Sequence, residues 1–166
     1  MDGRIYPYHF HIICSDSSIH QALILNGEDT LYFYSDSVKI DELKSTYKKD
    51  YGQEVKMKEI FKSNIVYGSG CGRYGIDPDE RFQMKRAIKE NDKNFLMNWL
   101  KSPILELNLY GLEGLAAIDD LELTKEEIQI IEKAKSKKGT ARTCSGCEYT
   151  RRDFQYYSYL FSEIGL

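Results

Sequence analysis

The sequence predicts a mainly α-helical protein built from antiparallel helix pairs, with an irregular or partly extended N-terminal segment. Beyond residue 76, apolar residues recur at helical spacing, and polar capping residues precede successive apolar segments. Short connections between these segments favour antiparallel neighbours. A length of 166 residues allows one domain of ordinary size. We therefore expect a single domain over 1–166, with a mixed N-terminal part at 1–67 and a helical part at 76–166.

The N-terminal part carries the weaker signals. Side chains alternate over 4–14 as they do in an extended segment, although Pro7 argues against a central strand. Asn26-Gly27 is a turn signal. The other elements expected here are a short helix capped at 15–18, a strand or buried helical turn at 31–34, and a helix over 39–50.

Capping residues mark the helices of the C-terminal part. Asp77 and Pro78 form an N-cap with proline at the first helical position. Thr124 and Glu127 have the spacing of a capping box. The expected helices are 78–89, one that Asp92 caps and Pro103 stops, 104–118, one that begins at Thr124, and a last one opened by Thr150 with Asp153.

The segment 92–119 resembles a HEAT-type repeat. Its first helix ends in the turn Trp99-Leu100-Lys101-Ser102-Pro103, which fits the apolar-Leu-Lys-Ser/Asp-Pro pattern of that family. Gly111 and Gly114 stand where a repeat commonly places alanine, so they let two helices approach closely despite their low helix propensity. The resemblance implies HEAT- or armadillo-like packing of helix pairs. The tail, with its Thr-Cys-Ser-Gly-Cys segment, is also similar to that of small uncharacterised bacterial proteins, which imply no activity.

Cys144 and Cys147 form a C-x-x-C pair between two expected helices. Two thiolates at this spacing can form a reversible disulfide or one half of a tetrahedral zinc site. A zinc site needs two further ligands, and Cys71 is the candidate third participant. Structural thiols or a disulfide, zinc binding and redox chemistry are all open for this group. We expect no cofactor, with zinc as the alternative if the cysteines bind a metal.

The glycine-rich segment 67–75 contains a match to G-x-G-x-x-G at 70–75. In a dinucleotide-binding fold the helix starts inside this motif, and a second parallel strand follows. Here Asp77 and Pro78 begin a helix after the last glycine, and further helices are expected after it. We therefore interpret the segment as a flexible connector between the N-terminal and helical parts.

A local basic stretch with tyrosines is the candidate interaction surface. The net charge is −3, so no global field attracts the chain to nucleic acid. Basic residues between 133 and 152 with aromatic residues beside them are nonetheless what single-stranded nucleic acid binding requires. Tyrosine is also favoured at surfaces that recognise proteins. The residues of this candidate surface are Tyr149, Tyr156, Tyr159, Arg151 and Arg152.

The signals recovered concern packing and capping, and no catalytic set assembles from the sequence. We therefore predict a non-enzymatic interaction or binding module with a protein partner. The alternatives are a thiol-redox or zinc-binding protein centred on Cys144 and Cys147, and nucleic-acid binding through the basic stretch. No apolar run approaches the ~20 residues of a spanning helix, so no membrane span is expected. A chain complete as written predicts a cytoplasmic protein, and one that has lost a signal peptide predicts an extracytoplasmic protein.

Overall fold

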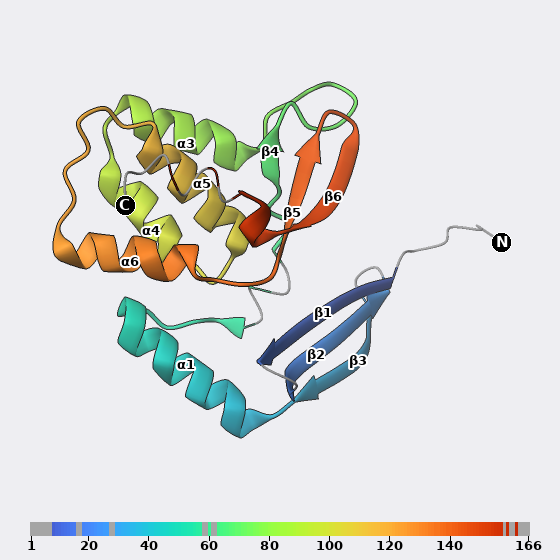
Figure 1. The fold of residues 1–166 in the computed structure, drawn as a ribbon. Coiled ribbons are helices and arrows are strands. Elements are labelled where there is room, and N and C mark those ends of the chain that lie inside the picture. Colours follow the sequence, from blue (N-terminus) through green and yellow to red (C-terminus); the bar gives the residue numbers. More distant parts are fainter. Residues whose placement is uncertain are drawn as a thin grey trace. The chain divides into compact units, whose positions relative to one another are not determined.

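The structure is a computed structural model that describes residues 8–15, 18–26, 29–57, 60, 63–157, 159 and 162. The chain divides into two compact units, Met1–Lys62 and Ser63–Leu166. Each unit combines a three-stranded sheet with α-helical segments (Figure 1). The prediction of a mainly α-helical, HEAT- or armadillo-like architecture is therefore wrong, because the protein mixes helices with two sheets.

The first unit is an antiparallel sheet followed by a helix. Its elements are β1 (Tyr8–Ser15), β2 (Ser18–Asn26), β3 (Asp29–Ser35) and α1 (Ser37–Tyr51), and the sheet order is β1-β2-β3. The short helix expected before Asn26 is strand β2 instead, because its residues pair with strands on both sides. Asp36 caps α1 by accepting a hydrogen bond from the Lys39 N–H at 3.2 Å. Gly52, in the left-handed conformation, ends the helix.

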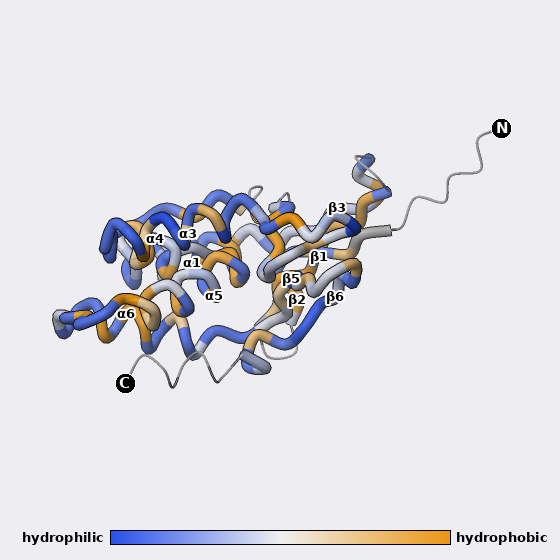
Figure 2. Tube along the Cα trace, turned by 90° about the horizontal axis from the view of Figure 1, so that it is seen from above, coloured by the Kyte–Doolittle hydropathy of each residue, from blue (hydrophilic) through white to orange (hydrophobic). Residues whose placement is uncertain are grey.

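The second unit packs helices against a mixed sheet. Its elements are β4 (Tyr67–Ser69), α3 (Asp79–Lys89), α4 (Lys93–Leu100), α5 (Leu105–Ala116), α6 (Lys125–Lys135), β5 (Thr140–Ser145), β6 (Glu148–Asp153) and the 3-10 helix η1 (Phe154–Tyr157). Strand β5 pairs with β4 in parallel and with β6 in antiparallel orientation. Apolar residues recur among polar ones at helical spacing along α3 and α6 (Figure 2), which is typical of helices with one buried face. None of the helices described is long and apolar enough to cross a membrane.

Helix α5 forms the centre of the second unit. Its fully buried side chains are Asn108, Leu109, Tyr110, Leu112 and Leu115. A Cβ atom on Gly111 would lie 2.7 Å from Cδ2 of Leu100, and one on Gly114 would lie 2.6 Å from Cδ2 of Leu96. Both leucines belong to α4, so the expectation that these glycines let two helices approach closely is confirmed. The α4–α5 pair packs in a unit that also contains a sheet, and a HEAT-like repeat is not supported.

The predicted helix starts agree with the structure at two of the capping sites. Asp92 accepts a hydrogen bond from the Phe95 N–H at 3.0 Å, and Thr124 with Glu127 forms the complete capping box. The expected cap at Asp77 differs, since its carboxylate accepts a hydrogen bond from the Gly70 N–H at 2.8 Å and does not cap α3. A side chain that suits a helix cap can equally bind a loop that the sequence places seven residues away.

The last predicted helix is wrong at its start, because its opening residues belong to a β-hairpin. Thr150 lies opposite Thr143 on β5, and their hydroxyl groups are 2.9 Å apart. Gly146 provides the positive φ of 56° for the two-residue turn between β5 and β6. Asp153 then accepts a hydrogen bond from the Gln155 N–H at 2.8 Å and starts η1. The helical part expected over 76–166 is thus interrupted by two strands.

The glycine-rich segment is also not a flexible connector. Its first residues, Tyr67–Ser69, form strand β4 and pair with Thr143, Cys144 and Ser145 of β5. This parallel pairing joins segments that are far apart in the sequence, so local patterns do not reveal it.

Lys137 is a partly buried cation that binds the end of α4. Its Nζ donates hydrogen bonds to the carbonyl oxygens of Ser102 at 2.7 Å and Leu100 at 3.2 Å, and to Oδ1 of Asn108 at 2.8 Å. Carbonyls at a helix C-terminus lack partners inside the helix, so an amine at this place satisfies them. Burial lowers the pKa of Lys137 to about 7.

Replacing Lys137 by methionine is expected to flatten the pH dependence of stability. The unfolded amine titrates at about 10.5, so between about pH 7 and pH 10 the unfolded state binds more protons than the folded state. In the wild type, the Lys137 amine therefore makes the free energy of unfolding increase with pH over this range, by up to about 1.4 kcal/mol per pH unit. Urea unfolding across this range measures the slope. The exposed neighbour Lys138→Met is the control and should keep the wild-type slope; an unchanged slope in Lys137→Met would contradict the burial.

Candidate functional site

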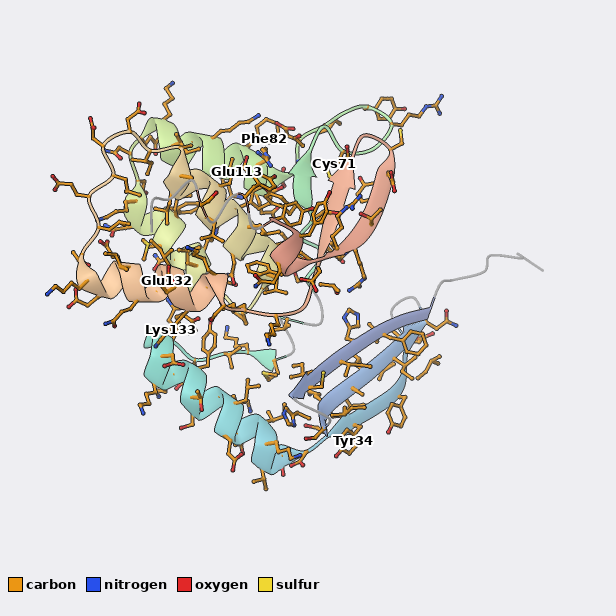
Figure 3. The ribbon with its side chains drawn as sticks, viewed as in Figure 1. Tyr34, Cys71, Phe82, Glu113, Glu132 and Lys133 are labelled. Atoms are coloured by element: carbon orange, nitrogen blue, oxygen red, sulfur yellow. A yellow bond between two sulfur atoms is a disulfide. The ribbon has the colours of Figure 1, made fainter. Side chains whose placement is uncertain are left out.

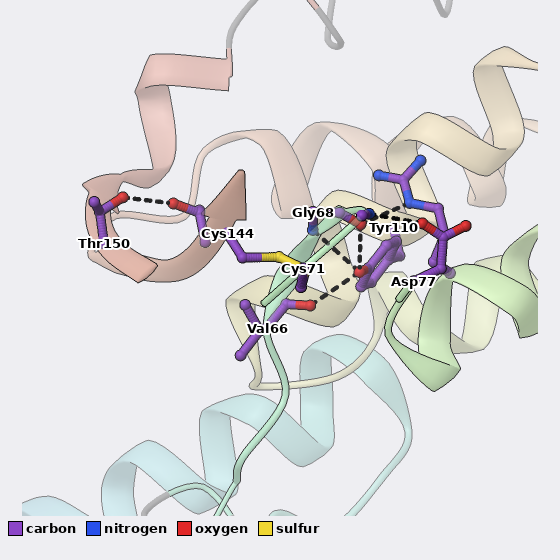
Figure 4. The surroundings of a disulfide bond; sticks show 10 residues. Val66, Gly68, Cys71, Asp77, Tyr110, Cys144 and Thr150 are labelled. Atoms are coloured by element: carbon purple, nitrogen blue, oxygen red, sulfur yellow. Dashed lines mark hydrogen bonds between the residues drawn. A yellow bond between two sulfur atoms is a disulfide. The ribbon is translucent and has the colours of Figure 1, made fainter. Parts of the chain in front are cut away.

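Cys71 and Cys144 form a disulfide bond, with their Cα atoms 5.6 Å apart (Figure 4). The two residues are 73 positions apart in the sequence. Cys147 and Cys14 are exposed free cysteines. The structure therefore brings together two of the three predicted cysteines, and joins Cys144 to Cys71 rather than to its C-x-x-C neighbour.

This pairing bears directly on the zinc alternative. Zinc binds cysteine as the thiolate, and sulfur atoms in a disulfide are not thiolates. Within the described ranges, no group of three or more His, Cys, Asp or Glu side chains is placed to hold a metal ion. Zinc binding by Cys71, Cys144 and Cys147 would need the disulfide to be reduced first, and it stays a prediction.

Close approach of β4 to β5 positions the disulfide. Gly68 lies opposite Cys144, and a Cβ atom on Gly68 would overlap the carbonyl oxygen and Sγ of Cys144. Only glycine therefore permits this contact. Beyond β4 the chain folds back, and Cys71 and Ile76 exchange backbone hydrogen bonds of 2.8 and 3.1 Å.

The loop that carries Cys71 also rests on the hairpin turn. The Gly72 N–H donates a hydrogen bond to the carbonyl oxygen of Gly146 at 2.7 Å. Cys147 is the next residue of that turn, and its side chain is exposed. The disulfide and this hydrogen bond together hold the loop at 70–76 against the hairpin.

A partly buried group of polar side chains fixes β4 from the helical side. Arg81 donates from Nε to the carbonyl oxygen of Gly68 at 2.8 Å and from Nη1 to Oε1 of Glu113 at 2.5 Å. The Tyr67 hydroxyl donates to Oε2 of Glu113 at 2.8 Å, and the Tyr110 hydroxyl accepts from the Gly68 N–H at 3.1 Å. The Arg81 guanidinium lies 5.6 Å and 5.2 Å from the centres of the Tyr67 and Tyr110 rings.

The electrostatics of this group suit a structural clamp. Burial raises the pKa of Tyr110 to about 12, and burial together with the nearby Glu113 carboxylate raises the pKa of Tyr67 still further. Both hydroxyls therefore stay protonated at neutral pH. Both carboxylate oxygens of Glu113 already accept hydrogen bonds, and Arg81 balances the charge. The arrangement links α3, α5 and β4.

The five residues of the predicted interaction surface are all exposed, but they do not form one group. Alternation along β6 places Tyr149 and Arg151 on one face of the strand and Arg152 on the other. The Arg152 guanidinium lies 4.9 Å from the centre of the Tyr156 ring. Tyr159 is exposed beyond η1. Binding of a protein or of nucleic acid through these residues stays a prediction.

Strand β3 of the first unit carries an exposed apolar surface that the sequence reasoning missed. Its large side chains are exposed at fractions of 55% for Leu31, 51% for Tyr32, 57% for Phe33 and 41% for Tyr34. Figure 3 shows the Tyr34 side chain at the end of this strand. The signal was present as a short aromatic run after the Asn26-Gly27 turn, but a strand and a buried helical turn fit that run equally well.

Comparison with known proteins identifies no relative, since no family model, no curated protein and no solved structure matches the chain.

Replacing Cys71 by serine is expected to lower the free energy of unfolding by about 4 kcal/mol, because the disulfide closes a loop of 73 positions. Urea unfolding of both proteins measures the difference. Cys147→Ser is the matched control and should leave stability unchanged, since Cys147 is exposed and free.

Alkylation of the unreduced wild type provides a direct test of the pairing. Cys14 and Cys147 should react, whereas Cys71 and Cys144 should react only after reduction. Peptide mass spectrometry that finds Cys144 joined to Cys147 would show the pairing to be wrong.

Proposed function

We propose that this protein is a non-enzymatic interaction module that binds an extended polypeptide segment along strand β3. The observation that carries the proposal is the exposure of every residue of β3, including the apolar run Leu31–Tyr34. In the described part of the chain, β3 pairs with β2 alone and is an edge of its sheet. An edge strand presents a row of N–H and C=O groups with which a further strand can pair.

Exposure on both faces of β3 favours addition of a strand over docking onto one face. Ser35 and Ile13 share a face of the sheet, because both lie opposite Gln21. Ile13 packs against the buried side chains of Ile40, Val55 and Met57. Phe33 lies on that same face two residues before Ser35, yet it is exposed. Tyr34 is exposed on the opposite face. A strand placed beside β3 would cover Phe33 and Tyr34 together.

Strand β3 also lacks the residues that protect edge strands from pairing. Its sequence contains no lysine, arginine, proline or glycine, and its one charged residue, Asp29, stands at its start. Strand β6, an edge of the other sheet, differs in this respect. Its charged residues are Glu148, Arg151, Arg152 and Asp153. The contrast makes β3 a better edge than β6 for a partner strand.

Photo-crosslinking tests this function. We expect benzoylphenylalanine at position 33 of the full chain to form covalent adducts with a polypeptide on illumination in cells that produce the protein. The control is the same photoreactive residue at position 38, because Val38 is an apolar residue of α1 that is 67% exposed. No polypeptide adduct from position 33, or equal adducts from both positions, would refute the proposal.

A further inference from the structure

We propose that one face of the β5–β6 hairpin binds single-stranded nucleic acid, with a phosphate between Arg142 and Arg151 and a base on the ring of Tyr149. The three residues share this face, because Arg142 lies opposite Arg151 and the alternation of β6 places Tyr149 on the same side as Arg151. The site belongs to the second unit and is independent of the function proposed for strand β3.

The side chains of Arg142 and Arg151 begin close together. The Arg142 N–H donates to Oε1 of Glu106 at 2.6 Å and so does not point to Arg151. The two arginines are therefore a non-hydrogen-bonded pair of the ladder, in which the Cβ atoms are about 5 Å apart. Like charges at this separation repel each other. A phosphate between them would replace the repulsion with two charge-assisted contacts.

The positive charge of this pair is only partly balanced. In the part of the chain that the structure describes, neither arginine forms an ion pair with a carboxylate. Glu106 is near both, and burial raises the pKa of its carboxyl although the two arginines oppose that shift. Asp153 stands at the far end of the face and accepts a backbone hydrogen bond from η1. The Arg142 side chain binds the Ser63 carbonyl oxygen at 3.4 Å, so most of its five N–H donors remain for a ligand.

Tyr149 and the loop at 70–76 extend this face with aromatic and basic side chains. Tyr149 is 58% exposed, and a Cβ atom on Gly72 would lie 3.4 Å from its hydroxyl oxygen. The ring therefore reaches from the hairpin to the loop, which the disulfide holds in place. Arg73 and Tyr74 follow Gly72 and are both exposed, Tyr74 at 83%. Aromatic rings among arginines suit the bases and the phosphate backbone of a single strand.

These features favour single-stranded nucleic acid over other anions. An acidic peptide would satisfy the arginines but leave the exposed Tyr149 ring without a stacking partner. Stacking on tyrosine needs the free face of a base, which a duplex keeps inside its own stack. The charged residues along β6 also disfavour a polypeptide strand at this edge.

The opposite face of β6 supplies a control within the same strand. The Arg152 guanidinium lies 4.9 Å from the centre of the Tyr156 ring, and both side chains are exposed. A site spread over the whole basic stretch would use this pair as well. The proposed site does not use it.

Fluorescence anisotropy of a fluorescein-labelled oligothymidine with the purified full chain tests the inference. The wild type should bind at low salt, and the logarithm of its affinity should fall linearly with the logarithm of the salt concentration. Arg151→Gln should weaken binding about five- to tenfold at low salt and reduce the salt slope by about 0.7, the loss of one phosphate contact. Tyr149→Ala should weaken binding at least about fivefold, whereas Tyr149→Phe should bind as the wild type, because it keeps a stacking ring.

Arg152→Gln and Tyr156→Ala are the matched controls and should bind as the wild type, with circular dichroism confirming that each variant is folded. No binding at low salt, or an equal loss in Arg151→Gln and Arg152→Gln, would overturn the inference. A duplex or a polyglutamate that competes as well as unlabelled oligothymidine would overturn it too, because the site would then recognise charge alone. None of these results bears on strand β3, since Leu31–Tyr34 lies in the other unit.

Discussion

A strand of three residues, β4, is held against β5 by a contact that requires glycine at position 68. So short a strand has few ladder hydrogen bonds, and side chains from two helices supply the rest. Arg81 binds the Gly68 carbonyl, and the Tyr110 hydroxyl binds the Gly68 N–H. The disulfide from Cys71 to Cys144 then fixes the loop after β4. Burying these polar groups is tolerated because each has a partner.

The helices of the second unit could be predicted because their signals are local. The capping box of Thr124 and Glu127 spans four residues, and the helix glycines Gly111 and Gly114 belong to one apolar face. The strands could not be predicted in the same way, because β4 is specified by β5, which lies more than seventy residues later. Thr150 shows the ambiguity, since threonine suits a helix cap as well as a strand, and its partner Thr143 decides between them.

The cysteines show the same limit at the candidate site. The sequence marked Cys71, Cys144 and Cys147 as one group, and the structure joins two of them. Spacing favoured Cys144 with Cys147, yet these residues lie at a tight turn, and the chain places Cys71 across from Cys144 through the register of Gly68. Which thiols meet is thus a property of strand pairing that the spacing of the cysteines does not contain.

The two sheets also differ in the side chains that their edge strands β6 and β3 expose to solvent. Charges along β6 make pairing with a further strand costly, so that sheet can end there. Strand β3 has aromatic side chains on both faces and one charge at its start, so its exposed surface adds little to the stability of its own unit. Leaving such side chains in water forgoes the gain from burial, which is about 25 cal/mol per Å² of apolar surface. That gain remains available to the partner strand proposed for β3, and the hydrogen-bonding groups of the edge would direct where such a strand binds.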